Sequence, residues 1–330
     1  MFSRTRITAI AAVAATGLLL ASCSQGSPSG GGGEGGSGET EGLTSVTVGV
    51  LKIAPSAAVQ YGIDEGIFEE HGLDVTLAEA QGGAAMLPSV STGEYDFGIG
   101  NGLSVLTAAT QGIDMRMVSG YSYSLAEGED INAVVVRAGD GIESWSDLEG
   151  KTVATNTLKT QGDLTINEAI ERDGGDPSSV EYIEVPFPDA LAQLEAGNAD
   201  AVWIPEPFYS AAKADAETFS IVGFPNQDSI PGLPTMVSFA SGATVDDNPE
   251  LVQQWRDALT ETLDAATADD EGLRETIVEF TGMPAETVEV IGLERLSGEL
   301  EDDLIVQLSD MAVKWGFLES EPDLDTVIAP

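Results

Sequence analysis

The chain has 330 residues, with 13 Lys and Arg against 56 Asp and Glu, so its formal net charge is −43. This charge excludes a protein that binds nucleic acid by neutralising phosphates, and a single cysteine and a single histidine exclude a disulfide framework and most metal or acid–base sites. The hydrophobic content of 42% is enough for a sizeable core, and the length favours two domains.

A signal peptide is predicted over residues 1–22. Arg4 and Arg6 give a positively charged start, and an apolar run follows over residues 7–20. This run is shorter than the ~20 residues that a membrane-spanning helix needs. The sequence Leu-Ala-Ser-Cys at 20–23 resembles the bacterial lipobox, which implies that Cys23 is lipid-modified and becomes the mature N-terminus. The alternative is an ordinary secretory signal with an incidental cysteine.

A flexible linker is predicted over residues 23–43. After Cys23 this segment consists of Ser, Gly, Pro and Glu with almost no apolar residue, so it buries too little surface to fold. A lipid followed by such a spacer holds a folded body beside a membrane without inserting it. No later segment is apolar for long enough to span a membrane. We therefore expect a protein anchored by its lipid alone on the extracytoplasmic face of the cell membrane.

The first half of the folded body alternates short strands with helices. Strands are predicted at 46–51, 73–77 and 95–99, and helices at 57–65, 84–91 and 101–109. Short loops join these elements. This order predicts a mainly parallel sheet covered by helices.

A second run of the same kind begins near residue 132. Strands are predicted at 132–137, 152–154, 182–185 and 201–204, with helices at 161–172 and 188–196. From Pro249 onward the chain is almost entirely helical, and the predicted helices are 250–266, 271–280, 285–291 and 298–314. The whole pattern predicts an α/β fold with two α/β lobes, a central cleft and a helical C-terminal tail.

Five polar loops, each containing Gly, Pro or several hydroxyl and amide side chains, lie between a predicted strand and the helix that follows it. They are 54–56, 81–84, 100–102, 156–161 and 205–208. In open α/β sheets, ligands bind beyond the carboxyl ends of the strands, where helix N-termini present free N–H groups. We therefore expect these loops to surround a ligand site.

Several stretches in a fixed order resemble the SsuA/THI5-like solute-binding proteins of ABC importers, which take nitrate, sulfonates, taurine and thiamine-precursor pyrimidines. The matching stretches are 61–68, 70–75, 93–98, 147–154, 194–201 and 206–208. The resemblance implies a type II periplasmic-binding-protein fold, with residues 44–130 and 224–330 in lobe 1 and residues 131–223 in lobe 2. Closure of such lobes on a solute requires that the solute contact both of them.

The resemblance also implies a function. It implies capture of a small nitrogen- or sulfur-containing organic solute (sulfonate-, taurine- or nitrate-like) and its delivery to an ABC permease with an ATPase subunit. The alternative solute is a thiamine-precursor pyrimidine or another amine. A ligand sensor subunit and an enzyme of the same fold stay open as alternatives. We expect a monomer with no cofactor, no metal, no nucleic-acid partner and no enzymatic activity, since no Ser–His–Asp set or Walker-type loop is present.

The candidate ligand-binding residues come from the polar loops and from the start of the strand predicted at 132. They are Ser56, Gly83, Ala84, Asn101, Asn132, Thr157, Lys159, Thr160, Gln161, Glu206 and Phe208. Ser56, Asn101 and Thr160 equally suit helix capping, and Phe208 equally suits core packing or stacking on a flat ligand.

Two charged candidates point to opposite ligands. Lys159 is one of few cations in the body, so it either neutralises an anion or faces solvent. Glu206 lies between two prolines, where a carboxylate repels nitrate or a sulfonate and favours an amine or a ring N–H. The alternative for Glu206 is a capping or hinge salt bridge.

Overall fold

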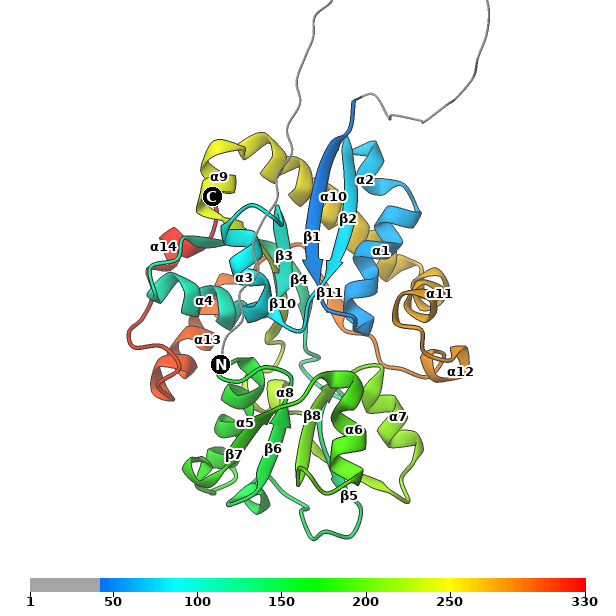
Figure 1. The fold of residues 1–330 in the computed structure, drawn as a ribbon, viewed down its shortest axis with the longest axis vertical. Coiled ribbons are helices and arrows are strands. Elements are labelled where there is room, and N and C mark those ends of the chain that lie inside the picture. The colour runs from blue at the N-terminus through cyan, green and yellow to red at the C-terminus, as the bar shows by residue number, and fades with distance from the viewer. Residues whose placement is uncertain (1–41) are drawn as a thin grey trace, which may run out of the picture. The chain divides into compact units, whose positions relative to one another are not determined.

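Two separate β-sheets organise residues 42–330, the part of the chain that this computed structural model describes (Figure 1). The first sheet has the strand order β11-β4-β10-β3-β1-β2, and the second has the order β7-β6-β8-β5-β9. No helix within the described residues is long and apolar enough to cross a membrane. The predicted signal peptide, Cys23 and nearly all of the predicted linker lie outside the described residues.

The first sheet mixes parallel and antiparallel pairs. Strand β1 pairs in parallel with β2 and β3, whereas β10 pairs antiparallel with β3 and β4, and β11 pairs antiparallel with β4. Its strands are β1 (Thr44–Val50), β2 (Leu73–Glu79), β3 (Phe97–Gly100), β4 (Met115–Tyr123), β10 (Pro234–Ser241) and β11 (Arg295–Leu296).

The second sheet is also mixed. Strand β6 pairs in parallel with β7 and β8, and β5 pairs antiparallel with β8 and β9. Its strands are β5 (Asn132–Arg137), β6 (Thr152–Thr155), β7 (Glu181–Glu184), β8 (Ala201–Pro205) and β9 (Phe219–Gly223). We call each sheet with the helices that pack on it a lobe, the first sheet giving the first lobe.

The prediction of mainly parallel sheets is wrong, because β4, β9 and β10 were not predicted and they supply most of the antiparallel pairs. Every residue of β10 is buried, so its sequence shows no alternation of apolar and polar residues. Its serines form buried hydrogen bonds instead of facing water; Ser238 Oγ, for example, accepts a hydrogen bond of 2.8 Å from Trp255 Nε1. A central strand of this kind lacks the pattern that identifies a half-buried strand.

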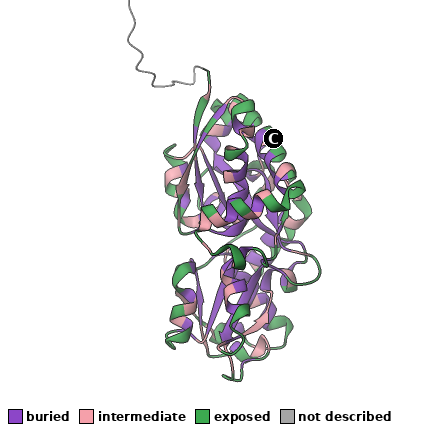
Figure 2. Cartoon of the chain, turned by 90° about the vertical axis from the view of Figure 1, so that its right-hand side faces the viewer, coloured by how far each residue is buried: buried purple, intermediate pink, exposed green. Residues whose placement is uncertain are grey.

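Helices cover both sheets. The strands are largely buried, and the outer sides of the helices are largely exposed (Figure 2). The first lobe carries α1 (Ala57–Asp64), α2 (Ile67–Glu70), α3 (Gly83–Ser91), α4 (Gly102–Thr110), α9 (Gly242–Asp247), α10 (Pro249–Ala268), α11 (Asp270–Thr281), α12 (Ala285–Val288), α13 (Asp302–Lys314) and α14 (Leu324–Val327). The second lobe carries α5 (Gln161–Arg172), α6 (Phe187–Glu195), α7 (Phe208–Ala214) and α8 (Pro225–Ser229). The predicted tail helices are present, although α12 ends at Val288 instead of 291 and α13 begins at Asp302 instead of 298.

The chain passes between the lobes twice, from β4 to β5 and from β9 to β10. Helix α8 packs against α5 and β5, so residues 225–229 belong with the second sheet. The predicted boundary at residue 224 therefore falls just before this helix rather than after it.

The centre of the first lobe is an aromatic stack. The Trp255 ring in α10 lies between Phe97, at a centroid distance of 4.7 Å, and Phe68, at 5.3 Å, and in both pairs the ring planes are nearly parallel. Helix α10 is held on the sheet by this stack. It anchors the C-terminal tail to the lobe that the N-terminal strands build.

Candidate functional site

A cavity of about 50 Å³ lies between the two lobes, close to both chain crossings. The first lobe contributes residues from the end of β1 and the starts of α3 and α4, and the second contributes residues from the ends of β6 and β8 and the starts of α5 and α6. The lining residues are Leu51, Ile53, Pro55, Gly83, Asn101, Ile131, Asn132, Asn156, Thr160, Gln161, Phe187, Trp203, Pro205, Asn226, Thr235, Met236 and Glu294.

An aromatic pair forms part of the second-lobe wall. The rings of Phe187 and Trp203 pack edge to face with centroids 5.7 Å apart. Gly162 makes room for the indole, because a Cβ at this position would lie 2.7 Å from Trp203 Cε3. Phe208 does not line the cavity and instead stacks on Phe187, with ring centroids 6.3 Å apart.

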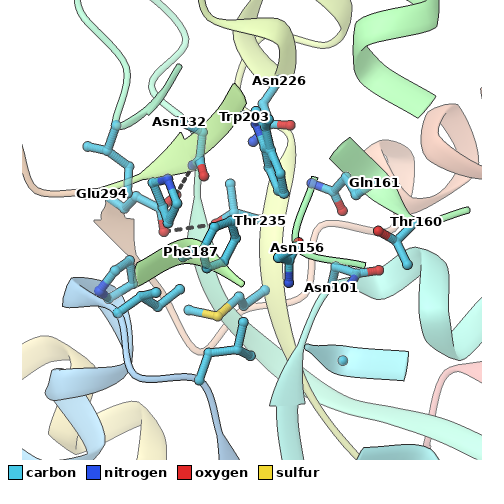
Figure 3. Close-up of a pocket in the computed structure, with 17 residues that line it drawn as sticks. Asn101, Asn132, Asn156, Thr160, Gln161, Phe187, Trp203, Asn226, Thr235 and Glu294 are labelled. Atoms are coloured by element: carbon cyan, nitrogen blue, oxygen red, sulfur yellow. Dashed lines mark hydrogen bonds between the residues drawn. The ribbon is translucent and has the colours of Figure 1, made fainter. Parts of the chain in front are cut away.

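A buried carboxylate, Glu294, lies on the opposite side of the cavity from Thr160 and Gln161 (Figure 3). Asn132 Nδ2 donates to Glu294 Oε1 at 2.9 Å, and Thr235 Oγ1 donates to Glu294 Oε2 at 2.9 Å. The Thr235 hydroxyl lies 2.8 Å from that of Ser122. The cluster joins β5 of the second lobe, β4 and β10 of the first, and the loop before β11.

The surroundings of Glu294 are electrically negative. Burial, together with the negative charge of Asp130, raises the pKa of Glu294 to about 7. Burial also raises the pKa of Asp130 to about 6. Of the described residues that line the cavity, Glu294 is the only charged one, so no lysine, arginine or histidine in the wall balances it.

Three other side chains present unused hydrogen-bonding atoms in the cavity wall. Gln161 Nε2 donates to the carbonyl oxygen of Pro234 at 3.0 Å, which leaves Gln161 Oε1 buried without a protein partner among residues 42–330. Trp203 Nε1 and both amide atoms of Asn226 are also buried without one. Because buried polar atoms are nearly always hydrogen-bonded, these atoms are available to a ligand or to water.

Five of the predicted site residues line the cavity: Gly83, Asn101, Asn132, Thr160 and Gln161. Two of them also serve the local structure. Asn101 Oδ1 accepts from Ser104 N at 2.9 Å and caps α4, and Thr160 Oγ1 donates to the carbonyl oxygen of Thr157 at 2.8 Å. Capping and a place in the cavity wall are therefore compatible for Asn101.

Four further candidates lie outside the cavity lining. Ser56 is fully buried just before α1. Ala84 and Lys159 line a second, wider groove, to which Thr160 also contributes. Thr157 packs against Gly82, where a Cβ would lie 2.5 Å from Thr157 Oγ1, so glycine there lets the two lobes meet. The side chain of Lys159 is exposed, and its backbone N–H donates to Asp163 Oδ2 at 2.7 Å.

Glu206 is a carboxylate with a structural role. It is 1% exposed, and its oxygens accept from Ser210 N at 2.9 Å, from Ser210 Oγ at 2.7 Å and from Gly292 N at 3.3 Å. It therefore caps α7 and ties the second lobe to the tail, which is the capping or hinge alternative. The carboxylate that faces the cavity is Glu294 instead.

The sequence did not identify the residues that give the cavity its character. These are Asn156, Phe187, Trp203, Asn226, Thr235 and Glu294. Asn156 begins the predicted polar loop 156–161, so its position in that loop could have identified it as a site residue. Thr235 and Glu294 come from segments with no strand–helix loop, and only the fold brings them to the cavity.

Comparison with known proteins gives the same architecture. The family model described as NMT1/THI5 like matches residues 55–272. A putative ABC transporter periplasmic binding protein of Brachyspira hyodysenteriae is 24% identical over 275 residues, which cover 80% of this chain and 74% of the relative. A putative binding protein of Brucella abortus is 25% identical over 210 residues, and the match spans 62% of its length and 63% of this chain.

Solved structures share the fold at low sequence identity. The aliphatic sulphonate binding protein SsuA of Escherichia coli has a TM-score of 0.70 and 17% identity, covering 86% of this chain and 97% of its own. The nitrate-binding protein NrtA of Synechocystis has a TM-score of 0.69 and 13% identity, covering 86% and 84%. A Candida albicans protein described as having the generic periplasmic binding protein fold has a TM-score of 0.69 and 14% identity, covering 87% and 96%. The fold is therefore the type II periplasmic-binding-protein fold that the resemblance implied, and it is built on two mixed sheets.

The raised pKa of Glu294 predicts a pH-dependent stability. Because its folded-state pKa of about 7 exceeds the ordinary value, the folded chain loses stability as pH rises from about 4.5 through 7. Glu294→Gln keeps the size and shape of the side chain and removes its charge, so it removes this loss. We expect the variant to gain about 1–3 kcal/mol over the wild type between pH 5 and pH 8, measured by chemical unfolding. Asp130 titrates in both proteins, so its effect is common to them. Free energies of unfolding that change with pH in parallel in the two proteins would contradict the prediction.

Proposed function

The chain belongs to the NMT1/THI5-like family, and we propose that it is the extracytoplasmic solute-binding protein of an ABC importer. The relative in Brachyspira hyodysenteriae, described as a putative ABC transporter periplasmic binding protein, supports the importer. The single structural observation that carries the proposal is a cavity whose wall comes from both lobes. A solute there contacts both lobes, so its binding free energy favours the closed arrangement.

The size of the cavity indicates that the lobes move. About 50 Å³ has room for only a few water molecules. An organic solute of even modest size therefore enters only when the lobes separate. Closure around it then gives the permease two distinguishable states of the protein, loaded and unloaded.

Contacts between the lobes outside the cavity support closure. Lys314 Nζ, at the end of α13, lies 2.7 Å from Glu168 Oε2 in α5, and Trp315 Nε1 donates to the same oxygen at 2.9 Å. Burial would raise the pKa of Glu168, but the hydrogen bonds from Lys314, Trp315 and Arg172 outweigh it and lower the pKa. In the cavity wall itself, Asn156 Nδ2 adds a link between the lobes by donating to the carbonyl oxygen of Gln81 at 2.9 Å.

We expect Glu168→Gln to shift the chain toward separated lobes. The substitution removes the charge that holds Lys314 and Trp315, at a cost of about 1–2 kcal/mol to the closed arrangement. Small-angle scattering should then give a larger radius of gyration than for the wild type. Glu195→Gln, on the exposed face of α6, removes the same charge as the matched control and should leave the radius unchanged. An unchanged radius in Glu168→Gln would show that this cluster does not hold the lobes together.

The importer itself tests the proposed function. The purified chain, loaded with a solute found by a thermal-shift screen, should stimulate ATP hydrolysis by the permease and ATPase subunits encoded near its gene, reconstituted in proteoliposomes. The unloaded chain is the control. Stimulation of a membrane histidine kinase in place of the transporter would contradict the import function and favour a sensor subunit.

We further propose that Cys23 carries the lipid that anchors the chain, since the Leu-Ala-Ser-Cys sequence closes an apolar signal segment. Cys23→Ala should then move the protein from the membrane fraction to the medium or periplasm. Its melting temperature should stay the same, because the strands and helices of the two lobes are built from residues 44–330. Retention of the variant in membranes washed with high salt would contradict the anchor.

A further inference from the structure

We propose that the solute is a basic nitrogen compound, an amine, amidine or protonated nitrogen ring, whose N–H group binds Glu294; the inference rests on the proposed binding function. The proposal starts from the one formal charge that the described cavity wall carries. It concerns only which chemistry the cavity selects, and it separates this chain from its structural neighbours named for sulphonates and nitrate.

Glu294 has hydrogen-bonding capacity left after its protein contacts. Each carboxylate oxygen accepts one hydrogen bond, from Asn132 and from Thr235 respectively. A carboxylate offers about four acceptor positions, so roughly two remain for a ligand. Asn132 and Thr235 also fix the orientation of the group, so a ligand meets a carboxylate that is already in place.

The charge of Glu294 has no compensating cation in the described cavity wall. Asp130, whose charge raises the pKa of Glu294, is also an acid and adds to the negative potential. A buried charge is expensive unless it is paired, so the arrangement favours a ligand that brings a positive charge or an N–H donor. An anion would meet like charge at this end of the cavity.

The rest of the wall suits a flat nitrogen compound. Phe187 and Trp203 provide apolar area and ring faces, and a cation near such faces is attracted to them. Gln161 Oε1 and Asn226 Oδ1 are unused acceptors that would take further N–H groups. Trp203 Nε1 and Asn226 Nδ2 are the unused donors, which suits a ring that also carries an acceptor nitrogen.

Helix starts in the cavity wall, those of α3, α4, α5 and α6, would favour an anion, and the start of α5 lies beside an unpartnered side-chain atom. Gln161 opens this helix, and the N-terminal N–H groups of a helix attract negative charge. The side-chain amide oxygen of Gln161, Oε1, however, is the unsatisfied atom at this position, and it is an acceptor. The side chains therefore favour a donor even where the helix alone would not.

The test is a screen of matched ligands. Flat bases such as benzamidine, 4-aminopyridine and 4-aminopyrimidine, together with small alkyl amines, are each paired with a sulfonate or carboxylate of similar shape. Thermal shift identifies the binders, and titration calorimetry at pH 8 gives their affinities. We expect the binders to be bases, and we expect Glu294→Gln to lose about 30-fold or more in affinity for them.

Glu299→Gln is the matched control. It removes the same charge from an exposed position of the same tail segment and should bind the bases like the wild type. Binding of a sulfonate or carboxylate with affinity unchanged in Glu294→Gln would overturn the charge inference and leave the proposed binding function standing. Base binding that is unaffected by Glu294→Gln, or no shift with any base, would also overturn it. Failure of every member of both sets would count against the proposed function as well.

Discussion

The hydrogen-bonded carboxylate of Glu294 is the contact on which the described arrangement of the cleft depends. It receives Asn132 from the first residue of β5 and Thr235 from β10, so one side chain ties together both sheets and the C-terminal tail. A buried acid is costly, and its cost is offset only while both donors remain in place. Glu294 therefore both helps to hold the crossing segments in position and sets the charge of the cavity. A chain that altered Glu294 for specificity would also alter how the lobes are joined.

The sequence predicted the parts of the fold that have local patterns. Helix α5 was predicted with its observed bounds, and the strand–helix units of both lobes were found because each is short and strongly apolar. Strands β4 and β10 were missed for the opposite reason. They are long, buried on both faces and contain serines. The hydroxyls of Ser122 and Ser238 bond to Thr235 and Trp255, partners that tertiary structure brings to them. Those partnerships cannot be read along the chain.

The same distinction divides the candidate site. Residues at the carboxyl ends of parallel strands, such as Asn101 and Gln161, could be proposed from the sequence because topology fixes where such loops meet. Glu206 had an equally suggestive position, yet the structure turns its carboxylate to Ser210 and Gly292. The sequence therefore suggested an acid in the cavity wall but named the wrong one: Glu294, not Glu206, lies there. In a chain with 56 acidic residues, nothing short of the fold distinguishes the one that faces the cavity.

Different contacts in this molecule contribute to the affinity for a solute and to the selectivity between solutes. The contacts of Glu168 with Lys314 and Trp315 lie outside the cavity, so they change the free energy of the closed arrangement by the same amount for every solute. Selectivity is a difference between two binding free energies, and such a uniform term cancels from it. Glu294 acts on the solute itself, and its effect reverses sign between a cation and an anion. Substitutions in the outer cluster are therefore free to tune how tightly this fold holds its solute, while the identity of that solute depends on the few polar atoms of the cavity wall.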